Sequence, residues 1–89
     1  MTKVTVFEDF DNFREEGDAG AICYMNDPVE GIALKCPCCA RETYIPLQEP
    51  GPVWKWDGNK EKPTLSPSIQ FVGGCRWHGW LRGGEFVNV

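Results

Sequence analysis

Two short segments that hold four of the five cysteines and the single histidine place the strongest constraint on this chain, because together they offer the ligands of a metal site. The first, CPCC, supplies Cys36, Cys38 and Cys39, and the second, CRWH, supplies Cys75 and His78 at C-x-x-H spacing. Glycines flank the second segment, and glycine supplies the positive φ angles that a sharp metal-binding turn requires. Three thiolates and one imidazole from these segments would form a tetrahedral Cys₃His site for Zn²⁺.

The size of the chain favours such a staple. With 89 residues, the chain is long enough for one domain, but domains this small often add a disulfide or a structural metal to their core. The N-terminal segment MTKVTVFEDF has no signal-peptide pattern, and no apolar run reaches the roughly 20 residues that span a bilayer. We therefore expect a cytoplasmic protein without membrane contact, in which clustered cysteines bind metal rather than form disulfides.

Runs of β-prone residues predict a mainly β fold of the small α+β type. An N-terminal part over residues 3–17 should hold a strand at 3–7 and a short helix that Asp9 caps and Gly17 ends. Further strands are expected at 21–25, 31–36, 43–47, 53–56, 68–72 and 85–89, with a tight hairpin turn at 57–60. The sequence thus predicts a single antiparallel β domain over 1–89, resembling a zinc ribbon or a Rieske domain, with a metal-binding core over 21–89.

One cysteine of the first segment is in excess. C-x-C spacing pairs Cys36 with Cys38, whereas the C-P-x-C pattern pairs Cys36 with Cys39, so spacing alone leaves the second ligand open. The spare thiol would be reactive, because a nearby cation favours its thiolate. Cys23 lies alone in an apolar segment and is expected in the core. Because C-x-C and C-x-x-H loops resemble those of Rieske proteins, a [2Fe–2S] electron-transfer protein is the alternative to a zinc protein.

Charge bears on the choice of partner. The net charge is −4, and residues 1–30 hold two basic against eight acidic residues. Such a balance disfavours nucleic acid, and a nucleic-acid-binding zinc knuckle is therefore the last alternative. It would use the basic side chains of the second half, namely Arg41, Lys55, Lys60, Lys62, Arg76 and Arg82.

Four tryptophans point to a protein partner instead. Trp is enriched at the energetic centres of protein interfaces, although small β domains also use it to fill the core. The candidate binding residues are Trp54, Trp56, Trp77 and Trp80 together with Arg76, and Trp77 is the best candidate for an exposed contact. In the same region Thr64, Ser66 and Ser68 are expected to bond nearby backbone groups or to support the metal ligands.

The segments CPC, WKWDGNKEKPTLSPSI and CRWHGWL resemble a family of small uncharacterised proteins from bacteriophage and prophage genomes. Its members typically carry C-x-C-G, W-x-W-D-G-N, P-T-L-x-P-S-I and C-G-W-H-G-[YW]-L, and some bear the label ammonia monooxygenase without any supporting chemistry. The resemblance covers most of the chain. It implies a metal-binding domain with Cys36, Cys38, Cys75 and His78 as ligands and leaves Cys39 as the alternative to Cys38.

Catalysis is not expected. Four protein ligands close a zinc site to water, and once His78 binds the metal no histidine remains as the base for a serine. Glu42 and Asp57 lie near the ligands in sequence but belong to no deaminase-type motif. The sequence therefore predicts a non-catalytic zinc-binding accessory domain of a phage or prophage. It would act in the host cytoplasm by binding a protein, such as a host factor or a defence protein.

Overall fold

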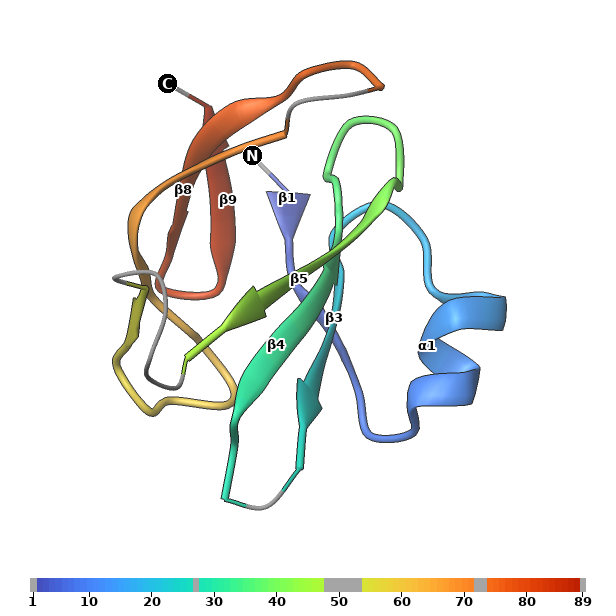
Figure 1. Cartoon of the computed structure of the whole chain (residues 1–89). Helices are drawn as coiled ribbons and strands as arrows, with labels where there is room; N and C mark the ends of the chain where they lie inside the picture. The colour runs from blue at the N-terminus through green and yellow to red at the C-terminus, as the bar shows by residue number, and fades with distance from the viewer. Residues whose placement is uncertain (1, 27, 48–53, 72–73, 89) are drawn as a thin grey trace.

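The computed structural model describes residues 2–26, 28–47, 54–71 and 74–88, which form two β-sheets and a short helix (Figure 1). The five-stranded sheet has the order β1-β9-β8-β7-β6, and the four-stranded sheet has the order β2-β3-β4-β5. The elements are β1 (Thr2–Lys3), β2 (Thr5–Phe7), α1 (Phe10–Glu16), β3 (Ala21–Met25), β4 (Gly31–Lys35), β5 (Glu42–Pro46), β6 (Lys55–Trp56), β7 (Leu65–Gln70), β8 (His78–Arg82) and β9 (Glu85–Asn88).

The first segment of the chain belongs to both sheets. The strand predicted at 3–7 is divided at Val4, so that β1 pairs antiparallel with β9 whereas β2 pairs parallel with β3. The α1 crossover makes the parallel pairing possible, because parallel strands cannot be joined by a tight hairpin. The other recorded strand pairs are antiparallel, and the prediction of a mainly β fold with antiparallel sheets and one short helix is confirmed.

The four-stranded sheet lies between the five-stranded sheet and α1, as Figure 1 shows. All five residues of β4 are buried, because both faces of this strand are covered. One face contributes Ile32 and Leu34 to the core between the sheets, while Ala33 packs in a smaller core with Phe13 of the helix. Cys23 is buried in this second core, which confirms its expected place.

The helix has the ends that the sequence predicts. Asp9 is the N-cap, and its carboxylate accepts a hydrogen bond from the Asp11 amide at 3.4 Å. Gly17 ends the helix with a φ of −66°, so its role is not a left-handed conformation. A Cβ at this position would collide with the Phe13 carbonyl oxygen, which accepts from the Gly17 amide at 3.0 Å. Glycine is therefore required here for close approach.

Lys35 ties the helix to the four-stranded sheet. Its ammonium group donates to the carbonyl oxygens of Arg14 at 3.0 Å and Gly17 at 2.9 Å, although its side chain is buried. Carbonyl groups at a helix end have no partner within the helix, and a cation there also interacts favourably with the negative end of the helix dipole.

Among the described residues, no helix is long and apolar enough to cross a membrane.

The second half of the chain departs from prediction at two places. Residues 78–82 form β8, a central strand, although the sequence analysis listed no strand there and put His78 in a metal-binding turn. The tight turn predicted at 57–60 is instead a longer loop, because Asp57 accepts from the Asn59 and Thr64 amides and holds its two ends together. The strands predicted at 53–56, 68–72 and 85–89 correspond to β6, β7 and β9, but Val53, Val72 and Val89 lie outside the described residues.

Candidate functional site

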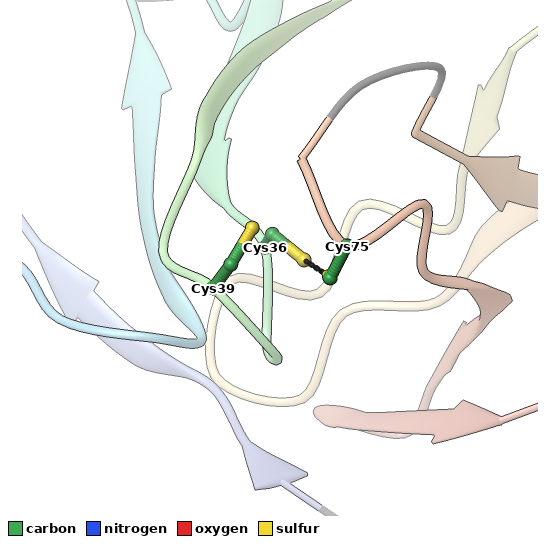
Figure 2. Close-up of side chains that lie close together, drawn as sticks. All are labelled: Cys36, Cys39 and Cys75. Atoms are coloured by element: carbon green, nitrogen blue, oxygen red, sulfur yellow. Dashed lines mark hydrogen bonds between the residues drawn. The ribbon is translucent and has the colours of Figure 1, made fainter.

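Three cysteines from the two sheets meet at one point. The sulfur atoms of Cys36, Cys39 and Cys75 all lie within 4.8 Å of one another, and those of Cys36 and Cys75 are 3.4 Å apart. Figure 2 shows the three side chains between the turn that follows β4 and the loop that precedes β8. Cys36 is buried, whereas Cys39 and Cys75 are exposed. This group is compatible with a metal ion such as zinc.

Backbone amides act on the cluster sulfurs. The amides of Cys75 and Arg41 point at the Cys39 sulfur and lower the pKa of this thiol to about 7. Burial raises the pKa of Cys36 to about 11, despite the amides of Cys39 and Cys38 that bond its sulfur. A hydrogen bond with the Cys75 thiol raises the pKa of Cys38. The amides favour the thiolate, which is the form that binds metal, and a cation would offset the cost of burying it.

The predicted ligands are thus only partly brought together. Cys36 and Cys75 meet with Cys39, which was the alternative, while Cys38 and His78 do not belong to the group within 4.8 Å. The imidazole of His78 instead places its Nε2 atom 3.1 Å from the hydroxyl oxygen of Ser68. The ligand set of Cys36, Cys38, Cys75 and His78 stays a prediction.

Ser68 and His78 lie on neighbouring strands, β7 and β8. The antiparallel register places Gln70 opposite His78, so Ser68, two residues earlier, lies diagonally across on the same face of the sheet. Both side chains are half-buried. A serine hydroxyl within hydrogen-bonding distance of an imidazole is the pairing of nucleophile and base found in serine hydrolases. No carboxylate of the described residues is recorded in a hydrogen bond with His78.

A groove lies beside the serine. Its lining comprises residues 41–45 around β5, Trp54, and residues 69–71, which directly follow Ser68. In the hairpin the Phe71 amide donates to the Trp77 carbonyl, so by the alternation of a β-ladder the Gln70 amide points away from β8. Ser68 thus directly precedes, along the chain, the residues 69–71 that line the groove.

The pairing of Ser68 with His78 places the chain among candidate serine hydrolases. A family model described as bacterial ubiquitination-like system serine protease (BubE) matches residues 8–89, and the chain belongs to this family. No curated protein and no solved structure matches the chain. The phage or prophage origin stays a prediction.

Family membership overturns two predictions. A non-catalytic zinc-binding accessory domain and the absence of enzyme activity are both wrong, because the family is that of a serine protease. The Rieske-like and nucleic-acid-binding alternatives fail for the same reason. The prediction of no enzyme activity rested on giving His78 to the metal, which left no base for a serine such as Ser68. In the structure the imidazole contacts this serine and is absent from the group of sulfurs.

Ser68 is the candidate functional residue that the sequence analysis missed, since it was assigned only a supporting role near the metal. The available signal was its place in the segment PTLSPSI, together with the single histidine of the chain in CRWHGWL. Neither segment reveals the pairing, because the distance between the two side chains depends on the register of β7 and β8.

The tryptophans occupy several different environments. Trp54, Trp56 and Trp77 pack against the main core, and Trp56 lies 5.0 Å from the Tyr24 ring. Trp77 is half-buried, makes edge contacts with Phe86, and donates to the Asn88 side chain at 2.6 Å. The remaining tryptophan, Trp80, stacks with the guanidinium of Arg82 at 4.5 Å. Arg76 is exposed in the loop before β8 with a φ of 55°. Their role in binding stays a prediction.

Proposed function

We propose that this protein is a serine protease that cleaves a ubiquitin-like protein of a bacterial conjugation system, with Ser68 as nucleophile and His78 as base. The observation that carries the proposal is the 3.1 Å separation of Ser68 Oγ and His78 Nε2. Family membership supports the reaction class and supplies the kind of partner.

The chemistry follows from the pair. The Ser68 oxygen attacks the carbonyl carbon of the scissile bond while its proton moves to His78 Nε2, and the imidazolium then protonates the leaving amine. Water attacks the resulting ester with the same ring as base, which releases the acid and restores the serine. This sequence requires the tautomer of His78 with its proton on Nδ1, so that Nε2 can accept the serine proton.

We further propose that the groove beside Ser68 binds the substrate as an extended strand. Two hydrogen bonds at the ends of β5 fix which of its residues bond to β4. The Cys36 amide donates to the Arg41 carbonyl, and the Leu47 amide donates to the Glu30 carbonyl. The odd-numbered residues from 41 to 47 therefore direct their backbone groups toward β4. Glu42 and Tyr44 then direct their backbone groups to the outer edge of the sheet. An extended peptide can add to such an edge, and the groove leads it along β7 toward the serine.

We propose that the ion at the cysteine cluster is zinc. Thiolates in a tetrahedral arrangement are the common ligands of structural zinc, and a domain of this size gains a large part of its stability from such an ion. The alternative, a [2Fe–2S] cluster, would make the protein coloured and redox-active. Metal analysis of protein purified without added metal separates the two.

The test of the protease proposal uses a fluorophosphonate probe, which forms a stable ester with an activated serine. The full chain is expected to gain one probe, on Ser68, and to cleave a ubiquitin-like protein of the same system that carries a C-terminal extension. Ser68→Ala should abolish labelling and reduce kcat/KM on the order of 10⁴-fold or more. The melting temperature should stay unchanged, because the hydroxyl lies outside the core.

Ser66→Ala is the matched control. Ser66 is an exposed serine of the same strand, two residues away, and its loss should leave labelling and cleavage as in the unsubstituted protein. Cleavage by the Ser68→Ala variant at the original rate would refute Ser68 as nucleophile.

A further inference from the structure

The turn after β4 has the backbone of a thiolate-binding knuckle. The Cys38 amide donates to the Cys36 sulfur at 3.4 Å. The Ala40 amide donates to the Cys36 carbonyl at 2.9 Å, and Ala40 has a φ of 62°, which is uncommon for a residue with a side chain. The turn therefore directs an N–H dipole at a buried sulfur, as an anion-binding turn does.

The loop before β8 is shaped around the same sulfurs. Gly74 and Arg76, on either side of Cys75, both have positive φ angles, of 63° and 55°. The loop passes close to the Cys39 sulfur at Gly74. A Cβ at Gly74 would lie 3.1 Å from that sulfur, so only glycine lets the loop approach without displacing it. Two turns from different sheets thus enclose one group of thiols.

A tetrahedral ion needs a fourth ligand, and the catalytic chemistry excludes His78 from this role. His78 is the single histidine of the chain. If its Nδ1 atom bound the ion, Nε2 would carry the remaining proton and could only donate to Ser68. The ring could then not accept the serine proton. This step rests on the proposed function, which requires a metal-free imidazole.

Cys38 is the side chain that fits the open position. It lies in the same turn as Cys36 and Cys39, and its backbone amide donates to the Cys36 sulfur at 3.4 Å. Its thiol is exposed and lies outside the group of sulfurs within 4.8 Å, so it would have to turn toward the ion to bind it. We propose that Cys38 supplies the fourth thiolate, so that the metal centre is a Cys₄ site made of Cys36, Cys38, Cys39 and Cys75. Such a site is closed to water and structural. It joins the two sheets and leaves His78 to the serine.

Cobalt substitution tests this ligand set, because the absorption of Co²⁺ reports the number and kind of its ligands. The full chain loaded with one Co²⁺ should show the thiolate charge-transfer bands of four sulfurs. His78→Ala should bind one Co²⁺ with an unchanged spectrum. Cys38→Ser should lower the charge-transfer intensity by about one quarter, since one of four thiolates is lost. Cys23→Ala removes a thiol outside the cluster and is the matched control, with an unchanged spectrum expected.

A changed spectrum or a lost ion in His78→Ala would overturn the proposal, as would an unchanged spectrum in Cys38→Ser. If Cys38→Ser does not fold, alkylation of the zinc-loaded, unsubstituted protein decides the question. N-ethylmaleimide should spare Cys38 until a chelator is added, and labelling of Cys38 while zinc is retained would overturn the proposal. Fluorophosphonate labelling of Ser68 is measured separately, so failure of the protease proposal is seen independently of the cobalt spectrum.

Discussion

The cysteine cluster and the Ser68–His78 pair are linked in sequence through Cys75, which lies three residues before His78, but they are assembled in different ways. Cys36 and Cys75 are 39 positions apart and come from turns of two sheets, whereas Ser68 and His78 are 10 positions apart on adjacent strands of one sheet. The cluster depends on how the two sheets pack, and the pair depends on the register of a single hairpin.

This difference implies a dependence in one direction. Cys75 is three residues from His78 and lies in the connection between β7 and β8, whose ends are joined by a 2.9 Å hydrogen bond from the Phe71 amide to the Trp77 carbonyl. Disorder at the sulfurs would therefore reach the imidazole through this loop. Loss of the Ser68 hydroxyl would leave the sulfurs as they are. A change at Ser68 should therefore leave the cysteine cluster intact, whereas a change at the cluster should also disturb the Ser68–His78 pair.

Metal removal should have the largest effect. Stripping the ion with a chelator, or replacing the buried Cys36 by Ser, should cost several kcal/mol of folding free energy, because structural zinc binding is itself folding energy. Cleavage activity should disappear with the fold. Thermal unfolding followed by circular dichroism, with an activity assay on the same samples, measures both. A zinc-free protein that melts and cleaves as before would end the argument for dependence of the pair on the cluster.

Gly79→Ala should have an intermediate effect and act on the pair alone. A Cβ at Gly79 would collide with the Val87 carbonyl oxygen and the Trp77 ring, so β8 must shift against β9 and carry His78 with it. We expect a loss of about 1–3 kcal/mol in stability. Cleavage should fall by about 100-fold, since misplaced catalytic groups are costly. Zinc content should stay at one ion per chain.

Gly83→Ala is the control for this substitution. Gly83 follows the other end of β8 and, unlike Gly79, has a positive φ, of 56°, but a Cβ there meets no atom within 4 Å. Gly83→Ala should strain the backbone at this positive φ without shifting β8, so we expect lower stability and nearly unchanged cleavage. Equal losses of cleavage in both variants would show that general stability, and not register, controls the pair.

The smallest effect is expected at Asn88. Asn88→Ala removes the acceptor of the Trp77 indole N–H at 2.6 Å, on the loop shared by both sites. Loss of one partly exposed hydrogen bond should cost about 1 kcal/mol, with cleavage and zinc content retained. Asn88→Asp keeps the acceptor and should restore the melting temperature. A collapse of activity in Asn88→Ala would mean that the loop is far less firmly held by its sulfurs than we infer.

Local patterns predicted much of the fold. The helix with its Asp9 cap, the strands at 21–25 and 31–35 and the meeting of Cys36 with Cys75 follow from capping chemistry, periodicity and ligand spacing. These signals lie within a few residues of the features they predict. The same kind of reasoning could not place Val4, where the chain passes from one sheet to the other, because that depends on distant partners.

The candidate active site depends on information of another kind. Residues 78–82 carry a histidine, a glycine and an arginine, and their composition gives no clear strand pattern; partners on both sides make them β8. Pairing of β7 with β8 then brings Ser68 to His78. In the sequence alone, a histidine near cysteines suits a metal ligand as well as it suits the base of a serine hydrolase. Only the register of β7 and β8 shows that His78 lies beside Ser68.

The contact of Ser68 with the only imidazole of the chain has a practical consequence for spectroscopy. One histidine gives one set of ring C–H signals in a proton NMR spectrum, so assignment needs no isotope labelling and no mutagenesis. The same signal, followed with pH before and after the serine is blocked, would report the protonation of the proposed base directly. The ring C–H signals of His78 can therefore be used to follow the binding of a ligand beside Ser68.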